Sequence, residues 1–328
     1  MKILVTGSSG RIGSCAVERL LAGGMAVRGM DMRASGREGV RRYDEIVAGF
    51  DQPDAATAAM KGVDAVLHLG AFMSWVAGDR AAMFSANVEA TRVLLDAAAA
   101  AGVRRVVFAS SGEVYPENAP QFLPVTEDHP LHPNSPYGLT KLLGEEMVRF
   151  HQRAGSFETV ILRFSHTQNA DELLDEDSFF SGPRFFLRPR IAQQRRFGNE
   201  TVARLLEAAD PGQPAHVLAR NQQGRPFRMH ITDTRDMVQG LELALDRPQA
   251  AGRVFNLGAT RPVDFAPLVD RMSAITGYPV VTVDLPGAGV YYETSNEKIR
   301  NELGFKPEWT IDRMLAGAAE ARKARQTR

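Results

Sequence analysis

The sequence predicts an α/β protein built on a doubly wound parallel sheet, with a smaller carboxy-terminal lobe. Over residues 1–165, short apolar runs alternate with stretches of helical periodicity. The runs are continuously apolar, as in Val106-Val107-Phe108, which is typical of strands buried on both faces. A glycine-rich turn from Gly7 to Gly13 joins the first run to the first helical stretch. With 328 residues, the chain is long enough to bury a large core.

Each element of the predicted sheet domain follows from this alternation, because crossovers through helices connect parallel strands. The expected strands are Lys2–Thr6, Ala26–Asp31, Glu45–Ala48, Ala65–Leu69, Arg105–Ser110 and Thr159–Arg163. The expected helices are Ile12–Ala22, Ala55–Met60, Arg80–Ala101 and Tyr137–Ala154.

The rhythm breaks after about residue 165. Residues 166–328 are therefore expected to form mainly a substrate-binding lobe, interleaved with the end of the sheet domain. Asp171–Asp177 and Pro211–Pro226 are predicted to be loops, because they are rich in acidic residues and turn formers, respectively. Helices are expected at Thr201–Ala209, Asp233–Leu245 and Phe265–Thr276, and a strand at Val254–Leu257.

Composition excludes several classes of function. Lysine plus arginine equals aspartate plus glutamate, at 39 each, so no overall basic field for nucleic acid is expected. The single cysteine, Cys15, cannot form an internal disulfide, which favours a reducing cytoplasm and a packing role in the first helix. No apolar run approaches the roughly 18 residues that span a membrane, and the start of the chain shows no signal-peptide pattern.

The glycine-rich turn predicts a Rossmann-type dinucleotide site. Gly7 permits a tight turn, Gly10 lets the backbone approach a pyrophosphate, and Gly13 allows the helix to pack closely on the strand. Arg11 and Ile12 open the helix, whose free N–H groups favour an anion.

Further residues are expected to bind the rest of the dinucleotide. Asp31, at the end of the second strand, favours NAD over NADP, because a carboxylate accepts ribose hydroxyls and repels a 2′-phosphate. Asp51 is a candidate adenine contact, although a solvated loop carboxylate is an alternative. Asn87 could line the cofactor site or hold neighbouring strands. After the fourth strand the chain continues as Leu69, Gly70 and Ala71, where small residues would let the backbone pass under the cofactor.

Ser111, Tyr137 and Lys141 form the candidate catalytic group. Ser111 follows the fifth strand, at the edge of a parallel sheet where ligands bind. Tyr137 and Lys141 are spaced i, i+4 and share one face of a helix. A phenol is a poor base at neutral pH, but a neighbouring ammonium and a positive nicotinamide ring favour the phenolate. Tyr137 would exchange the hydroxyl proton of a carbinol while Ser111 binds the same oxygen, and Lys141 would also reach the nicotinamide ribose.

These motifs resemble the extended short-chain dehydrogenase/reductases, the NAD-dependent epimerase/dehydratase family that includes UDP-glucose 4-epimerase. The resemblance covers nearly the whole chain and extends to later landmarks, namely His230-Ile231-Thr232-Asp233, Val254-Phe255-Asn256-Leu257-Gly258 and Asn301 to Pro307. It implies that Ser111, Tyr137 and Lys141 take the catalytic positions. It also implies a homodimer formed through helices near Arg80–Ala101 and Tyr137–Ala154.

The chain departs from the family pattern around the substrate. Gly112 stands where related dehydratases carry an aspartate, and His166 stands where nucleotide-sugar enzymes carry an asparagine. Arg225–Ile231 replaces the family's Arg-Asp-Phe/Tyr-Ile-His-Val segment, which allows a smaller sugar, sugar acid or polyol. In the segment Phe179–Phe197, at least one of three arginines (184, 188 and 190) is expected to meet an anionic substrate. The candidate substrate contacts are Ser74, Ser111, Glu113, His166, Arg184 and Arg188, and no metal site is expected.

The favoured function is an NAD-dependent sugar or nucleotide-sugar epimerase that transiently oxidises a carbinol carbon to a ketone. The alternative is an NAD-dependent dehydrogenase or ketoreductase acting on a sugar, sugar acid or polyol. A 4,6-dehydratase is disfavoured by Gly112, and a redox-sensing protein is disfavoured by the intact Tyr137–Lys141 pair.

Overall fold

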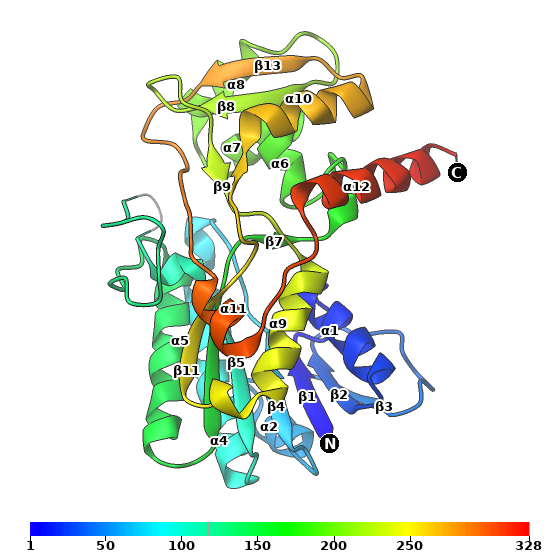
Figure 1. The fold of residues 1–328 in the computed structure, drawn as a ribbon, viewed down its shortest axis with the longest axis vertical. Helices are drawn as coiled ribbons and strands as arrows, with labels where there is room; N and C mark the ends of the chain where they lie inside the picture. The colour runs from blue at the N-terminus through cyan, green and yellow to red at the C-terminus, as the bar shows by residue number, and fades with distance from the viewer. Residues whose placement is uncertain (117–118, 328) are drawn as a thin grey trace.

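The computed structural model describes residues 1–116 and 119–327, arranged as a sheet domain with a smaller lobe beyond one end (Figure 1). Seven parallel strands form the central sheet in the order β11-β6-β5-β4-β1-β2-β3. Their bounds are Lys2–Thr6 (β1), Ala26–Asp31 (β2), Tyr43–Val47 (β3), Ala65–His68 (β4), Arg105–Ser111 (β5), Glu158–Phe164 (β6) and Arg253–Leu257 (β11). The chain order reverses between β1 and β4, and in such sheets ligands bind beyond the carboxyl ends of the strands at that point.

Helices cover both faces of the sheet, because alternate strand residues point to opposite sides. Ile3 and Val5 of β1 pack in one cluster with helices α1 (Arg11–Ala22), α9 (Thr234–Asp246) and α11 (Glu297–Leu303). Leu4 packs in the other cluster with α2 (Pro53–Ala59), α4 (Ala90–Ala100) and α5 (Pro136–Arg153). The expected doubly wound α/β fold is confirmed.

The helix expected over Arg80–Ala101 is interrupted. It consists of α3 (Arg80–Phe84), a wider π-helical turn over Ser85–Glu89, and α4. Asn87 lies buried in that wider turn, where its amide donates to the Phe72 carbonyl oxygen at 2.8 Å and accepts from the Phe72 N–H at 2.7 Å. The turn thereby fixes the loop that follows β4.

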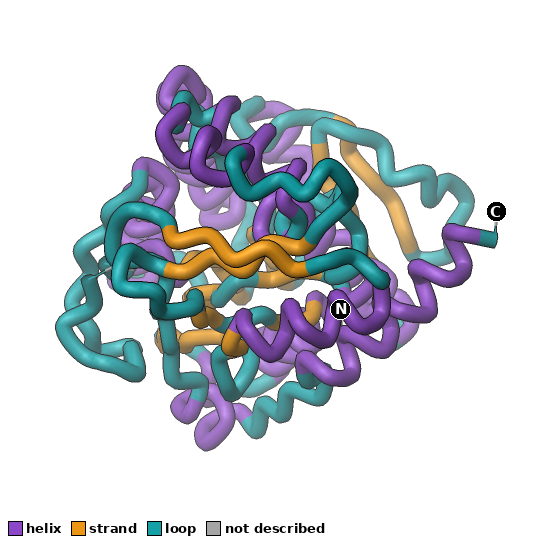
Figure 2. Tube along the Cα trace, turned by 90° about the horizontal axis from the view of Figure 1, so that it is seen from above, coloured by secondary structure: helices purple, strands orange, loops and turns teal. Residues whose placement is uncertain are grey.

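The smaller lobe has a core of its own beneath the parallel pair β8 (His216–Arg220) and β13 (Val280–Asp284), which lie side by side in the view from above (Figure 2). Its helices are α6 (Ser181–Phe185), α7 (Leu187–Arg196), α8 (Glu200–Glu207), α10 (Phe265–Thr276) and α12 (Ile311–Gln326). Two short strand pairings complete it and link it to the sheet domain: β7 (Thr167–Gln168) pairs with β10 (Thr232–Asp233), and β9 (Arg228–Met229) pairs with β12 (Val263–Asp264).

The chain crosses between the two parts more than once. After the lobe begins, α9 and β11 return to the sheet domain, where β11 pairs with β6. Within Pro211–Pro226, predicted as loop, the structure has the strand β8, whose Val217 is buried in the lobe core. The turn formers therefore flank a short buried strand instead of making one long loop.

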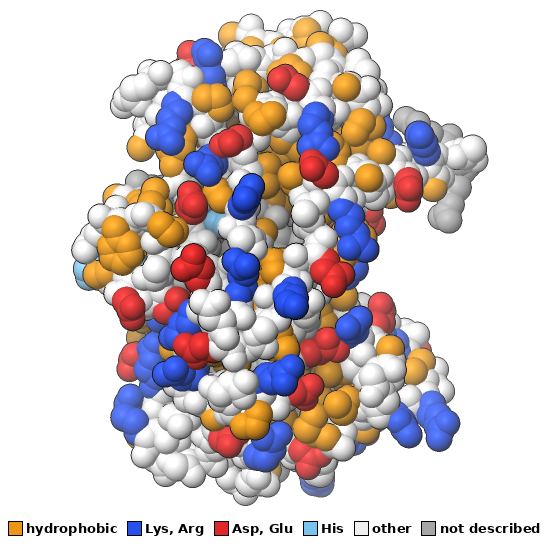
Figure 3. Space-filling view, viewed as in Figure 1, with side chains coloured by type: hydrophobic (Ala, Val, Ile, Leu, Met, Phe, Trp, Pro, Cys, Tyr) orange, Lys and Arg blue, Asp and Glu red, His pale blue; other side chains and the backbone are white. Residues whose placement is uncertain are grey.

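On the face shown in Figure 3, positive and negative side chains are interspersed over both parts. Among the described residues, no helix combines the length and apolar character needed to cross a membrane.

Candidate active site

The glycine turn brings two backbone segments into direct contact. Gly7 has φ +67°, and a Cβ atom there would lie 2.8 Å from the Gly70 Cα. A Cβ atom on Gly13 would lie only 2.0 Å from the Gly7 carbonyl oxygen. The Thr6 hydroxyl accepts hydrogen bonds from the Leu69 and Gly70 N–H groups, both at 3.1 Å, and so ties β1 to the end of β4. This turn fits a pyrophosphate, because no side chain separates the backbone from the opening of α1.

Asp31 lies beside the same turn. Its carboxylate accepts hydrogen bonds from the Ser9 N–H at 3.0 Å and from the Arg33 N–H at 3.1 Å. The two amides orient the carboxylate at the end of β2, where the sequence predicts a ribose contact. The Arg33 guanidinium donates to the Ser9 carbonyl oxygen at 3.3 Å.

Arg11 joins the turn to the lobe. Its Nε donates to Glu172 at 2.8 Å, and its guanidinium lies 5.1 Å from the ring centre of Phe180. Both Arg11 and Phe180 line a cavity of about 590 Å³ that extends from the glycine turn into the lobe. The cavity is therefore shared between a dinucleotide cradle and a second compartment.

Ser111, Tyr137 and Lys141 line this cavity together. Ser111 ends β5, and its hydroxyl accepts the Glu113 N–H at 3.1 Å. Tyr137 lies in the first turn of α5, which Ser135 caps by accepting the Gly138 N–H at 2.9 Å. The Lys141 Nζ donates to the Ala109 carbonyl oxygen at 2.8 Å and lies 5.7 Å from the centre of the Tyr137 ring.

The sequence predicts a lowered pKa for Tyr137, but the structure indicates the opposite for the protein without cofactor. Burial raises the pKa of Tyr137, and the neighbouring Glu113 raises it further. Burial lowers the pKa of Lys141 to about 8. In the protein alone, desolvation thus outweighs the ammonium, and a phenolate needs further positive charge near the ring.

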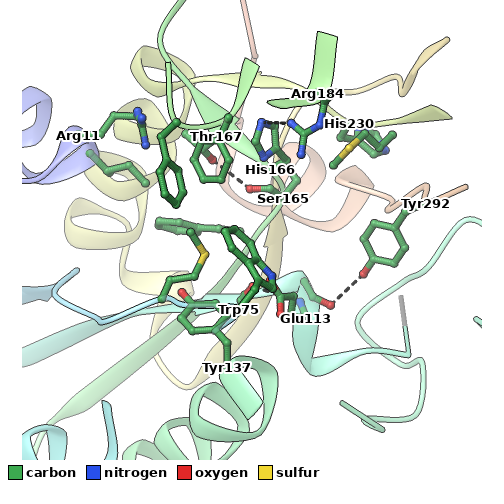
Figure 4. A pocket seen from close by; sticks show the side chains of 18 of the residues that line it. Arg11, Trp75, Glu113, Tyr137, Ser165, His166, Thr167, Arg184, His230 and Tyr292 are labelled. Carbon is green, nitrogen blue, oxygen red and sulfur yellow. Dashed lines mark hydrogen bonds between the residues drawn. The ribbon is translucent and has the colours of Figure 1, made fainter. Parts of the chain in front are cut away.

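Glu113 lies on the same wall as Tyr137 (Figure 4). It accepts the Ser135 hydroxyl at 2.5 Å, and burial raises its pKa. A Cβ atom on Gly138 would lie 2.1 Å from the Glu113 carbonyl oxygen, so α5 begins in direct contact with this backbone. Glu113 therefore influences Tyr137 and helps to hold the helix that carries it.

The opposite wall comes from the lobe and carries His166 and Arg184, with Trp75 between the walls (Figure 4). An Arg184 Nη donates to the His166 Nε2 at 2.7 Å. Burial, and then Arg184, lower the pKa of His166 well below its usual value, so this imidazole is neutral at neutral pH. Trp75 stacks on Phe179 with ring centres 5.9 Å apart.

The structure brings most of the predicted site residues to this one cavity. The lining includes Gly7, Gly10, Arg11, Ile12, Gly13, Leu69, Ser111, Glu113, Tyr137, Lys141, His166 and Arg184. Gly70 packs behind the lining against Gly7. Asn87 also lies behind it, where its amide donates to the Thr140 hydroxyl at 3.0 Å. Asp51 and Ala71 are exposed.

Two predicted substrate contacts need correction. The Ser74 hydroxyl donates to Asp79 at 2.6 Å, and its neighbours Met73 and Trp75 line the cavity instead. Arg188 is exposed on α7 and pairs with Asp210 at 3.4 Å. Two positions further along the helix, Arg190 lines the cavity in its place.

Sequence reasoning missed Trp75, Gln193 and Tyr292, which also line the cavity. Trp75 had a usable signal, since a large aromatic residue follows β4 at the carboxyl edge of the sheet. Tyr292 had none, because it approaches the site from the far end of the chain, where its hydroxyl donates to the Gly112 carbonyl oxygen at 3.0 Å. Among the described residues, no group of three or more His, Cys, Asp or Glu side chains could hold a metal ion.

A parallel sheet with a glycine cradle and a Ser–Tyr–Lys group in one cavity defines a nicotinamide-dependent oxidoreductase type of site. The model of the NAD-dependent epimerase/dehydratase family matches residues 3–172. A UDP-glucose 4-epimerase of Mycolicibacterium smegmatis is 37% identical, with 98% of each chain covered. A UDP-glucose 4-epimerase of Corynebacterium glutamicum is 27% identical, covering 98% of this chain and 95% of that protein.

Among solved structures, a short-chain dehydrogenase/reductase superfamily protein of Agrobacterium tumefaciens with bound NAD is 67% identical. It aligns with a TM-score of 0.96 over 100% of this chain and 98% of that one. The chain belongs to the NAD-dependent epimerase/dehydratase family, and its cofactor is NAD.

Proposed function

We propose that this enzyme is an epimerase that transiently oxidises a carbinol carbon of a sugar or nucleotide sugar. The observation that carries the proposal is the convergence of Ser111, Tyr137 and Lys141 on the cavity that begins at the glycine turn. The similarity to proteins named UDP-glucose 4-epimerase supports epimerisation.

Residues of this chain divide the chemistry among them. The glycine turn and Asp31 would hold NAD, which when bound would supply the hydride acceptor and donor for the carbinol carbon and, while oxidised, a positive charge near Tyr137. The Tyr137 phenolate oxygen takes the substrate's hydroxyl proton as the carbon is oxidised, and the resulting phenol gives it back as the carbon is reduced. The Ser111 hydroxyl orients the substrate oxygen. The Lys141 ammonium, fixed on the Ala109 carbonyl oxygen, favours the phenolate.

A dehydrogenase acting on a smaller substrate is the second candidate. Phe227 and Met229, from the segment that departs from the family pattern, line the lobe side of the cavity. Apolar side chains there suit a compact sugar, sugar acid or polyol better than a diphosphate.

Cofactor turnover distinguishes the two candidates. The NAD-loaded protein is incubated with UDP-sugars, free sugars, sugar acids and polyols, while product is followed by NMR and reduced nicotinamide by absorbance. A stereoisomeric product without net NADH supports the epimerase, and steady NADH formation supports the dehydrogenase. If no compound reacts by either route, or if Tyr137→Phe leaves the rate unchanged, the proposal is contradicted.

We further propose a homodimer formed through α5 and the helical stretch Arg80–Ala101. Leu139 (40% exposed), Leu143 (36%) and Phe150 (59%) are large apolar side chains on this helix. Light scattering should give twice the chain mass for the natural protein and a shift to monomer for Phe150→Glu. A monomeric natural protein contradicts this proposal.

The cytoplasm is the proposed location, since the single cysteine, Cys15, has no cysteine partner for a disulfide. Cell fractionation tests it, and recovery outside the cytoplasm would contradict it.

A further inference from the structure

Arg190 is a cationic side chain in the cavity wall with unused hydrogen-bonding capacity. It lies on α7, and its Nε is excluded from solvent without a hydrogen-bond partner. One Nη donates to the Arg184 carbonyl oxygen at 3.3 Å, and the guanidinium lies 5.9 Å from the ring centre of Phe227. A ligand in the cavity would therefore meet the two Nη groups of this donor-only side chain, of which only one has an acceptor among the described residues.

The positive charge of Arg190 is not neutralised within the described part of the chain, because no carboxylate there lies within ion-pair distance of it. Three other arginines of this region do have such partners: Arg188 pairs with Asp210, Arg195 with Glu207, and Arg11 with Glu172. Glu113 is the one carboxylate among the described lining residues, and it is bonded to Ser135 on the opposite wall.

The cost of this arrangement points to a ligand. Burial lowers the pKa of Arg190 to about 10, so the guanidinium is still charged at neutral pH. A desolvated charge without a partner destabilises a fold, whereas the same charge gains strongly from an anion that enters its site. A residue placed for packing alone would not need the guanidinium.

We propose that Arg190 binds the carboxylate of the substrate, and that the substrate is therefore a sugar acid. Resting on the proposed function, the inference names the substrate class for the same cavity. A carboxylate matches the two Nη groups of the planar guanidinium with two parallel hydrogen bonds. Phe227, which lies beside this guanidinium, and Met229 give the lobe side of the cavity apolar walls, which suit a compact carboxylate better than a diphosphate.

Binding can be tested without turnover. The NAD-saturated Tyr137→Phe protein is titrated by calorimetry with D-glucuronate, D-galacturonate and D-gluconate. The neutral partners are D-glucose and D-galactose, and the phosphoryl probes are D-glucose 6-phosphate and UDP-glucose. We expect at least one sugar acid to bind about 10-fold or more tightly than its neutral partner and than either phosphoryl probe.

Two arginines of one helix supply the variant and its control. Arg190→Gln, in the same background, should weaken binding of that sugar acid by about 10²-fold and abolish the preference over the neutral sugar. Arg188→Gln should leave both unchanged, since Arg188 pairs with Asp210 outside the cavity. Arg190→Lys should restore part of the affinity, because it keeps the charge and loses the planar edge.

A stability measurement separates a ligand contact from a structural arginine. Removing a half-buried charge that has no carboxylate partner should raise the melting temperature of the ligand-free Arg190→Met protein by roughly 2–4 °C. A structural role predicts a lower melting temperature.

The inference is overturned if no sugar acid binds more tightly than its neutral partner, if a phosphoryl probe binds best, or if Arg190→Gln keeps the preference. Because Tyr137→Phe cannot perform the proposed proton transfer, these outcomes are independent of whether the epimerase proposal holds.

Discussion

Where it meets the glycine turn, the cavity wall consists of glycines and backbone, whereas the wall on the lobe side carries aromatic and arginine side chains. On the sheet side, Gly7 and Gly13 bring the chain into contact with itself. On the lobe side, Phe180, Arg184 and Arg190 reach into the cavity from two short helices and the segment before them.

This difference shows how the protein recognises the dinucleotide on one side and the substrate on the other. A cradle of backbone N–H groups suits an unchanging ligand, the dinucleotide, and it requires particular residues at fixed spacing. A wall of side chains can be altered one position at a time without disturbing the sheet. We therefore expect residues of the lobe to select the substrate. The residues that carry out the reaction are expected where the lobe meets the sheet domain.

The largest expected effect lies at that border. Tyr137→Phe should lower kcat by about 10²–10⁴-fold, because it removes the proton-transferring hydroxyl. NAD affinity, measured by calorimetry, should hardly change. Tyr278→Phe, in the lobe core region away from the cavity, is the matched control and should keep full activity. If the kcat of Tyr137→Phe is unaltered, Tyr137 is not the proton-transferring group and the reaction takes place elsewhere.

Acid should weaken the lobe through a buried histidine. Burial lowers the pKa of His216 to about 4 from an ordinary 6.5. The unfolded chain therefore binds the proton first, so this contribution is complete above pH 6.5 and is lost as the pH falls toward 4. The difference corresponds to at most on the order of 3 kcal/mol in the free energy of unfolding.

Denaturant titrations at several pH values measure this loss. His216→Asn should flatten the decline between pH 6.5 and 4, and substitution of the exposed His132 by Asn should not. Parallel curves for the natural protein and His216→Asn would show that the acid sensitivity lies elsewhere.

On the sheet side, Gly13→Ala should cost about 2–3 kcal/mol in the free energy of unfolding and weaken NAD binding. The new Cβ atom would overlap the Gly7 carbonyl oxygen, which is backbone and cannot rotate away. Gly78→Ala is the control, because nothing lies within 4 Å of its Cβ position. Equal stability of the two variants would contradict the close contact.

The smallest effect is expected at Asp31. Asp31→Asn should weaken NAD binding by about 10-fold and narrow the preference over NADP, since the charge that repels a 2′-phosphate is lost. Affinities for the two dinucleotides, measured in parallel on both proteins, check this. An unchanged ratio would mean that another residue selects the cofactor.

The same contrast explains what could be predicted from the sequence. Gly7, Gly13 and Asp31 carry their meaning locally, because turn geometry and strand ends fix their positions. Tyr137 and Lys141 were predictable because one helical turn separates them. Arg188 and Arg190 were not distinguishable, since which face of α7 meets the cavity depends on how the lobe packs. Strand β8 was hidden because it is short and flanked by turn formers.

Isotope transfer tests the central claim most directly. A sugar that reacts is deuterated at its carbinol carbon and mixed with excess NAD-loaded protein, the reaction is quenched at intervals within a single turnover, and the cofactor and the product are analysed by mass spectrometry. The account predicts deuterium that appears on the cofactor as the ketone forms and then returns to the carbinol carbon of the product, with a rate of appearance lower by about 10²-fold or more in Tyr137→Phe. A product that has lost its deuterium to solvent, or transfer at the same rate in Tyr137→Phe, would contradict it.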